Sequence, residues 1–174
     1  MPTIKEIAKA CNVSVATVSN IINHKGSVGD ATRERVEQVI REMNYTPNYV
    51  AKNLKTKNTR SIGVIAEDMT VFALPDIIDG ITEYCEEEDY QILLVNLRLY
   101  KKFQDNYYRD NRHKEIVRQE IQKLLAKQVE GIIYVAAHER LINIIPEDLP
   151  IPTVVAYGFT GSEKIPSVVV KDIK

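Results

Sequence analysis

The chain lacks most of the features that mark secreted, membrane-spanning or metal-binding proteins. It has only two cysteines, Cys11 and Cys85, which lie far apart at apolar positions of helical spacing. We expect buried free thiols there, not a disulfide or a metal pair. The longest apolar runs, such as Ile62–Ala66 and Ile92–Val95, are too short to cross a bilayer. No apolar stretch of signal-peptide length follows Met1, so we expect a cytoplasmic protein.

Signals of enzymatic chemistry are also missing from the sequence. It contains no phosphate-binding loop, no glycine-rich dinucleotide turn and no clustered metal-ligand spacing, and its three histidines are dispersed. The acidic run Glu86–Asp89 falls at the end of a predicted helix and is typical of a solvated face. We therefore predict a protein that is not an enzyme and that needs no cofactor and no metal. An enzyme on an α/β scaffold stays an alternative that a turnover screen would reveal.

The charge is divided unevenly along the chain. Residues 1–60 hold ten Lys and Arg against five Asp and Glu, a balance of +5, whereas residues 61–174 hold thirteen against nineteen, a balance of −6. A basic head on an acidic body indicates binding of a polyanion by the head. The alternative is a chance asymmetry in a short segment.

Three short helices are predicted in the first 45 residues. Apolar residues recur at helical spacing from Ile4 to Cys11, from Val18 to Ile22, and from Val36 to Met43. Ser14 is a good N-cap for the second helix. Residues 46–60 hold too few apolar side chains for a core of their own and are predicted to be a linker with a marginal short helix.

From Ser61 the pattern changes to apolar strands that alternate with amphipathic helices. Strands are predicted at Ile62–Ala66, Gln91–Val95, Gly131–Val135, Thr153–Ala156 and Ser167–Val170, and helices around residues 77–85 and 116–125. This alternation is typical of a parallel sheet that is covered on both faces. The predicted fold class is thus α plus α/β, a three-helix head followed by a parallel-sheet lobe.

The strongest functional signal is the segment from Val13 to Asn23. A helix that opens at Ser14 carries methyls, hydroxyls and amides on its outer face, which are groups suited to base edges and phosphates. With the preceding helix and turn, it makes a helix-turn-helix. The pattern by itself leaves open a small helical bundle that merely has a polar face.

Several motifs, in order and spacing, carry a resemblance to a known family. They are Thr3-Ile4-Lys5-Glu6-Ile7-Ala8, Val13-Ser14-Val15-Ala16-Thr17-Val18-Ser19, Thr32-Arg33-Glu34-Arg35-Val36, Asn44-Tyr45-Thr46-Pro47-Asn48, Ala51-Lys52-Asn53-Leu54 and Ser61-Ile62-Gly63-Val64-Ile65. The chain resembles the lactose-repressor (LacI/GalR) family, nearly without interruption over its first 66 residues and more weakly from 67 to 174. The resemblance implies a helix-turn-helix DNA-binding domain at 1–46, a hinge helix and linker at 47–60, and the first lobe of a periplasmic-binding-protein-like effector domain at 61–174.

The resemblance also implies what the head contacts. The family binds double-stranded, roughly palindromic operator DNA as a homodimer, with the second helix in the major groove. By position, Val15, Ala16 and Asn20 would face bases. The residues that would hold phosphates are Thr3, Ser14, Thr17, Ser19 and Asn23. Many relatives carry arginine at the position of Asn20, and an amide favours adenine where arginine favours guanine.

In the family the linker becomes a helix on DNA and enters the minor groove. Leu54 stands where the family wedges a leucine between central base pairs, Ala51 is small enough for close approach, and Lys55 can reach a phosphate. The alternative for Leu54 is a surface leucine on a disordered tether. A protein with these contacts is expected in the cytoplasm, associated with the nucleoid.

The resemblance also implies that the lobe binds a small-molecule effector. Ligands of open parallel sheets bind beyond the carboxyl ends of the strands. The candidate effector-binding residues there are Asp68, Phe72, Arg98, His138 and Tyr157, with Thr70 and Asn96 beside them. An aromatic ring with hydrogen-bonding groups suits a sugar-like ligand. Each of these residues could equally be a loop residue with no ligand.

Two features depart from the family pattern. The segment Arg98–His113 is longer than its family counterpart. It is either a partner-binding or ligand-binding element, or an elaborated surface loop or helix extension. The chain is also about half the expected length and stops at the point where the family crosses into a second lobe. From this we expect a fragment or an incomplete gene product, with weak effector control and weakened dimerisation. A small-molecule binding module with a vestigial DNA head is the second functional reading.

Overall fold

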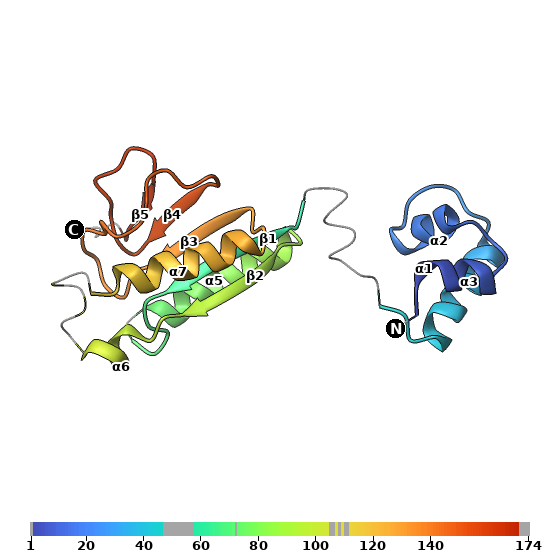
Figure 1. The fold of residues 1–174 in the computed structure, drawn as a ribbon, viewed down its shortest axis with the longest axis horizontal. Helices are drawn as coiled ribbons and strands as arrows, with labels where there is room; N and C mark the ends of the chain where they lie inside the picture. Colours follow the sequence, from blue (N-terminus) through green and yellow to red (C-terminus); the bar gives the residue numbers. More distant parts are fainter. Residues whose placement is uncertain are drawn as a thin grey trace. The chain divides into compact units, whose positions relative to one another are not determined.

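A computed structural model describes residues 2–46, 58–71, 73–104, 107, 109 and 112–170 of the chain. The chain divides into two compact units, Met1–Lys55 and Thr56–Lys174 (Figure 1). The first unit is a small helical head, and the second is a lobe built on one β-sheet. Each has its own hydrophobic core.

Three helices make up the head: α1 (Ile4–Ala10), α2 (Val15–Ile22) and α3 (Asp30–Glu42). Each contributes a side chain with no exposed surface, Ile7 from α1, Val18 from α2 and Val36 from α3. These three residues meet in one core because each lies on the apolar stripe of its helix. The three predicted helices are confirmed, with ends within one or two residues of those expected.

The lobe contains five strands and three helices among its described residues. In chain order they are β1 (Ser61–Ala66), α5 (Leu74–Glu87), β2 (Gln91–Asn96), α6 (Leu99–Phe103), α7 (Lys114–Ala126), β3 (Gly131–Val135), β4 (Thr153–Ala156) and β5 (Ser167–Val168). The strand order is β2-β1-β3-β4-β5, and every neighbouring pair is parallel. The predicted parallel sheet is confirmed.

Two details of the lobe differ from the prediction. The fifth strand is Ser167–Val168, not Ser167–Val170, because this edge strand pairs only with Val155 and Ala156 and the side chains after it are exposed. Helix α6 was not predicted, since a five-residue helix has no room for a helical apolar repeat.

The two long helices of the lobe cover opposite faces of the sheet. The chain passes from β1 through α5 to β2 on one side of β1, and then from β2 through α7 to β3 on the other side. Because parallel crossovers are right-handed, these opposite directions put α5 and α7 on opposite faces. Figure 1 shows α7 in front of the sheet and α5 behind it. The strand ends Ala66, Asn96 and Val135 are in register, so the segments that follow them share one edge of the sheet, the carboxyl edge.

Helix α7 packs closely on the sheet at a glycine. A Cβ placed on Gly63 of β1 would lie 2.7 Å from Leu124 Cδ1 and 3.3 Å from Leu124 Cγ. Leu124 is itself buried, so its side chain has little room to move away. Gly80, on α5, has no such neighbour within 4 Å. The absence of a side chain at position 63 therefore sets how closely α7 can approach β1.

A buried carboxylate ties the loops at the carboxyl edge together. Glu67, directly after β1, has no exposed surface and accepts hydrogen bonds from Tyr134 Oη at 2.6 Å, Ala137 N at 2.8 Å and Tyr107 Oη at 3.1 Å. Arg140 donates to both carboxylate oxygens, Nη1 at 2.9 Å and Nη2 at 2.5 Å. One side chain thus links the ends of β1 and β3 with the segment between α6 and α7. These five residues are called the Glu67 cluster.

The Glu67 cluster keeps its carboxylate ionised despite complete burial. Burial raises the pKa of Glu67, but the hydrogen bonds and charge of Arg140, with the Tyr134 and Ala137 donors, outweigh it and hold the pKa below its ordinary value. Burial and the neighbouring carboxylate raise the pKa of Tyr134 well above that of a free tyrosine. Burial and the same carboxylate also raise the pKa of Tyr107, so both tyrosines stay protonated and remain donors to Glu67.

The contrast between Gly63 and Gly80 makes a first prediction. Gly63→Ala should lower the free energy of unfolding of the lobe by about 1–2 kcal/mol because the new methyl overlaps Leu124. The matched variant Gly80→Ala should raise it by about 0.5–1 kcal/mol, since it removes backbone freedom inside a helix without a clash. Urea unfolding followed by circular dichroism measures both, and equal effects of the two variants would contradict the packing described.

A second prediction concerns the Glu67 cluster. Arg140→Met should destabilise the lobe by about 3 kcal/mol because it leaves a buried carboxylate without its cation. The double variant Glu67→Gln/Arg140→Met should recover much of that loss. The control Lys123→Met breaks the exposed pair with Glu120 and should cost at most about 0.5 kcal/mol. Urea unfolding followed by near-ultraviolet circular dichroism of the tyrosines measures the three variants.

The same cluster gives a pH dependence with a definite sign. Because the folded pKa of Glu67 is lowered, its contribution to stability is present above the unfolded pKa of about 4.3 and is lost as pH falls through the folded value. Acid unfolding of Glu67→Gln should lack this component. An unchanged acid transition in that variant would contradict the assignment.

Candidate functional site

The turn between α1 and α2 sets the start of the second helix. Asn12 has a left-handed backbone with a φ of 51°, a conformation that asparagine tolerates well. Ser14 is extended, and its Oγ accepts a hydrogen bond from Thr17 N at 3.0 Å and lies 2.8 Å from Thr17 Oγ1. This N-cap satisfies a free amide of the first turn, which fixes the point where α2 begins. The predicted cap is confirmed.

One face of α2 is buried and the opposite face is open. Val18 and Ile21 are buried in the head core, whereas Val15, Ala16 and Asn20 are exposed. These exposed positions fall on one side of the helix because successive residues turn by about 100°. Exposure of Val15 reaches 41%, which is high for an aliphatic side chain without a partner. The three residues predicted to face bases thus share an accessible surface.

Asn20 lies beside a glycine of the following turn. A Cβ placed on Gly26 would lie 3.5 Å from Asn20 Nδ2, and the φ of Gly26 is 74°. A glycine accommodates that backbone without strain and leaves space beside the amide. The backbone oxygen of Asn20 accepts a hydrogen bond from Lys25 N at 2.8 Å, so this turn is anchored to the end of α2.

The residues predicted to hold phosphates already have structural roles. Asn23 Nδ2 donates to Ser19 O at 2.7 Å and so closes the end of α2. Thr3 and Glu6 form a capping box at the start of α1, in which Glu6 Oε2 accepts from Thr3 N at 2.7 Å and from Thr3 Oγ1 at 2.9 Å. Hydrogen bonds from Thr3 lower the pKa of Glu6. Phosphate binding by Thr3, Ser19 and Asn23 stays a prediction.

The hinge and one effector candidate lie outside the described residues. Ala51, Leu54 and Lys55 belong to segment 47–57, and Phe72 follows Val71 at another gap. Their predicted roles rest on the sequence alone.

The carboxyl edge of the lobe carries the other candidate residues. Asp68 and Arg98 follow β1 and β2 closely, and His138 and Tyr157 follow β3 and β4. Arg98 is exposed and has a left-handed backbone with a φ of 54°, while His138 and Tyr157 are half-buried. Tyr157 packs against the lobe core. These four residues therefore lie along one edge of the sheet. Their contact with a ligand stays a prediction.

Internal partners already occupy one oxygen of each of two polar side chains at this edge, Asp68 Oδ1 and Asn96 Oδ1. Asp68 is almost fully buried and accepts from Thr70 Oγ1 at 2.7 Å, from Thr70 N at 3.1 Å, and from the backbone amides of Tyr100 and Lys101 at the start of α6. Asn96 Oδ1 accepts from two backbone amides, those of Arg98 at 3.1 Å and Met69 at 3.4 Å.

These contacts explain how α6 is held at the edge. Burial raises the pKa of Asp68, but the hydrogen bonds from Thr70 and α6 outweigh it and leave the pKa below its ordinary value. The Asp68 carboxylate is therefore charged and positions α6.

Sequence reasoning missed the Glu67 cluster. A signal was present, because Glu67 is a carboxylate placed directly after a fully apolar strand, where a buried charge needs a partner. The partners Tyr107 and Arg140 could not be identified, since they lie 40 and 73 residues away in sequence. The segment Arg98–His113 does contribute Tyr107 and the buried His113 to the lobe interior, with their rings edge-to-face at 5.3 Å.

Two cavities lie away from the candidate residues of the carboxyl edge. One of about 420 Å³ is bounded by α5 and by apolar residues of β1, β3 and β4, including Ile62, Ile133 and Val154. Another of about 610 Å³ lies between α7 and the segment Asn143–Pro150. Neither is lined by Asp68, Arg98, His138 or Tyr157.

The described residues include neither a metal-binding cluster nor a membrane-spanning helix. Among the described residues, no cluster of three or more His, Cys, Asp or Glu has the geometry to hold a metal ion. Within the same residues, no helix is both long and apolar enough to cross a membrane. Cys11 and Cys85 are buried and free, as predicted.

Comparison with known sequences gives matches over both units. The sequence model of the family described as "Bacterial regulatory proteins, lacI family" matches residues 3–48. The HTH-type transcriptional repressor PurR of Vibrio atlanticus (strain LGP32) is 33% identical over 158 residues, which cover 89% of this chain and 43% of the relative. The HTH-type transcriptional regulator RegA of Clostridium saccharobutylicum is 31% identical over 174 residues, covering 99% of this chain and 48% of the relative. The chain thus spans about half the length of these relatives.

Comparison with solved structures supports the same fold. A lac repressor dimer bound to operator and the anti-inducer ONPF matches with a TM-score of 0.74 at 22% identity, over 98% of this chain and 48% of that one. A lacI-family transcriptional regulator from Silicibacter pomeroyi matches with a TM-score of 0.70 at 21% identity, over the same shares of the two chains. At these identities the likeness concerns the fold alone.

The predicted fold class is borne out for the described residues, a helix-turn-helix head and a periplasmic-binding-protein-like α/β lobe. The predicted hinge helix lies outside them. The matched head motif, the collinear relatives and the shared fold agree with the resemblance inferred from the sequence. The chain belongs to the LacI/GalR family of bacterial regulatory proteins.

Proposed function

We propose that the chain is a sequence-specific DNA-binding transcriptional repressor and not an enzyme. It would bind a palindromic operator as a homodimer. Residues 1–46 would form the DNA-binding domain, residues 47–60 the hinge, and residues 61–174 the effector lobe. The observation that carries the proposal is the open face of α2, where Val15, Ala16 and Asn20 are exposed opposite a buried apolar face. A helix with small and polar outward side chains fits the major groove and can reach base edges there.

Charge supports the same role for the head. Residues 1–60 carry a balance of +5, so phosphate neutralisation would contribute to affinity and make it depend on salt. The names of the relatives, a transcriptional repressor and a transcriptional regulator, agree with this assignment. Thr3, Ser14, Thr17, Ser19 and Asn23 are the proposed phosphate contacts.

The lobe would receive a small-molecule effector at its carboxyl edge. Ligands of open parallel sheets bind beyond the carboxyl ends of the strands, where Asp68, Arg98, His138 and Tyr157 lie and where Phe72 falls in sequence. Effector binding would act by favouring one arrangement of the repressor over another, which changes its affinity for the operator.

Selection of bound duplexes from a random pool tests the proposal directly. The 174-residue chain should enrich an inverted repeat with a flexible pyrimidine–purine step at its centre. Binding should weaken steeply with salt, and specific sites should be favoured over bulk DNA by about 10³-fold or more. The outcome that contradicts the proposal is no preference for any duplex, even after the protein has been forced to dimerise by a crosslink.

A change at the exposed face of α2 should alter the base that is read. Asn20→Arg should shift the preference at one position of each half-site from adenine towards guanine, by about 1–3 kcal/mol, because a guanidinium pairs with guanine O6 and N7. The control Gln38→Arg adds the same charge at an exposed position of α3 and should leave the preferred sequence unchanged. A repeat of the selection with each variant gives the answer, and identical consensus sequences for Asn20→Arg and the parent would refute the base contact.

A change in the hinge should alter DNA bending. Leu54→Ala should leave the fold intact but weaken operator binding by about tenfold or more and abolish the kink, since the wedge that unstacks a base step is lost. Leu141→Ala, at a leucine of the lobe that is 53% exposed, serves as the control. Gel mobility of circularly permuted operator fragments measures the bend, and an unchanged bend would remove Leu54 from the mechanism.

A further inference from the structure

We infer that the carboxyl edge of the lobe selects a negatively charged small molecule, such as a sugar acid or a sugar phosphate, over its neutral counterpart. This inference rests on the proposed effector role of that edge and deepens it. The edge differs in the hydrogen-bond acceptors and the donors that it offers to a ligand.

Glu67, Asp68 and Asn96 at the edge already accept hydrogen bonds from other groups of the lobe. A neutral sugar presents hydroxyl hydrogens, which usually bind to carboxylate and amide oxygens of the protein. Glu67 is fully buried and accepts five hydrogen bonds from its cluster. Asp68 is almost fully buried and accepts from Thr70 and from the start of α6, and Asn96 Oδ1 holds two backbone amides. These three side chains therefore act on a ligand through the loops that they position.

The donors at the edge are open by contrast. Arg98, Lys101 and Lys102 are exposed, and none forms an ion pair with a carboxylate in the part of the chain that the structure describes. The amide group of Asn96 keeps its Nδ2 donor, since both described contacts of that side chain use Oδ1. The exposed carboxylates of the loop that carries Arg140, between β3 and β4, are Glu139, Glu147 and Asp148. Three exposed cations thus gather within five residues directly after β2, and the described residues of that segment, 97–104, include no carboxylate.

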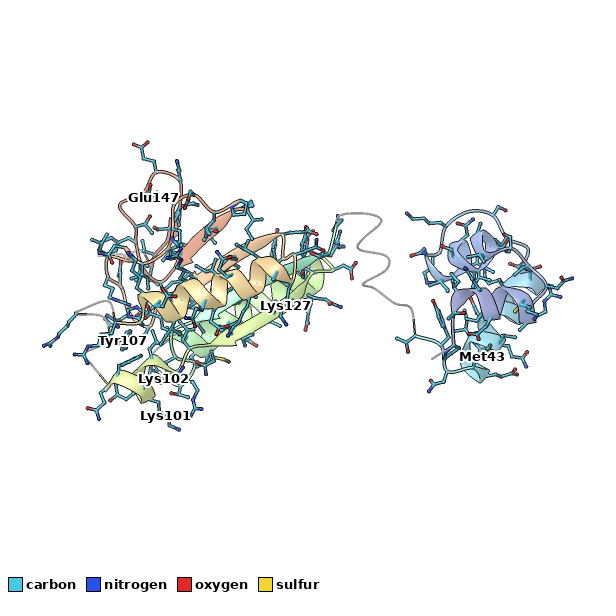
Figure 2. All side chains as sticks on the ribbon, viewed as in Figure 1. Met43, Lys101, Lys102, Tyr107, Lys127 and Glu147 are labelled. Atoms are coloured by element: carbon cyan, nitrogen blue, oxygen red, sulfur yellow. The ribbon has the colours of Figure 1, made fainter. Side chains whose placement is uncertain are left out.

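Position favours Arg98 as the residue that touches the anion. It comes two residues after β2, and its backbone amide is held by Asn96 Oδ1 at 3.1 Å. Its left-handed backbone precedes α6, whose first amides are held by Asp68. The guanidinium is therefore carried on a backbone fixed on both sides, and it can meet a carboxylate or phosphate with two parallel hydrogen bonds. Figure 2 labels Lys101, Lys102 and Tyr107 at this end of the lobe and Lys127 at the opposite end.

The test compares matched ligands on the 174-residue chain. The neutral and anionic members of two pairs are titrated separately: glucose against glucose 6-phosphate, and galactose against galacturonate. Binding is followed by NMR, through the amide chemical shifts of the isotope-labelled protein. We expect the anionic member of at least one pair to bind about tenfold tighter than its neutral twin, with the shifts centred on residues near Arg98 and with affinity that falls as salt rises. Affinities are expected in the millimolar range because Arg98 is exposed, and a ligand held at an exposed side chain buries little of its surface.

Two variants assign the effect to the proposed residue. Arg98→Asn removes the cation but keeps a residue suited to a left-handed backbone, so the fold should persist while the preference for the anion disappears. Lys127→Asn removes an exposed cation at the C-terminal end of α7, far from Arg98 in the lobe, and should leave the preference unchanged. A loss of preference in both variants would indicate the overall charge of the lobe and would overturn the assignment.

The remaining outcomes are also decisive. Equal affinity for charged and neutral twins, or no shift with any anion at about 20 mM, would overturn the inference. DNA selection with the same preparation separates this failure from a failure of the proposed function. An intact operator preference without anion selectivity removes only the inference, whereas anion selectivity without any DNA preference removes only the repressor role.

Discussion

The lobe depends on one buried carboxylate more than on any other polar contact. Glu67 directly follows β1 and accepts hydrogen bonds from the end of β3, from the loop that follows β3 and from the segment before α7. A charge with no access to water is tolerated only when such partners replace its hydration, so all of these segments must be in place at once. The constraint turns three separate chain segments into a single edge.

That constraint decides what the edge can offer to a ligand. The Glu67 and Asp68 carboxylates accept hydrogen bonds within the lobe and are buried, so they act as structural supports. The side chains that stay exposed to a ligand include cations such as Arg98. The head uses its polar groups in a similar way. Ser14 and Thr3 cap helices, which leaves the short side chains of α2 as an open surface on a rigid support. In both units, hydrogen bonds within the fold support the exposed residues that are proposed to bind.

The secondary structure was predictable where the periodicity was strong. The three head helices, both long lobe helices and four of the strands lie within a few residues of the predicted ranges. Helix α6 was missed because its five residues are too few for an apolar repeat, and its start is held by a tertiary contact, the hydrogen bond from Leu99 N to Glu67 O at 2.9 Å. The predicted strand end at Val170 was wrong because strand length at an edge depends on the neighbour that pairs with it.

The sequence by itself determined the family, the helix-turn-helix with its Ser14 cap, and the order of strands and helices along the chain. These depend on neighbours within a few residues, so local periodicity and capping chemistry are enough to specify them. Only the tertiary structure decided which polar side chains at the carboxyl edge are hydrogen-bonded within the lobe and which are exposed to solvent. Partners such as Glu67 and Arg140 lie far apart along the chain, and a buried charge finds its counterion through the folded sheet and not through sequence proximity.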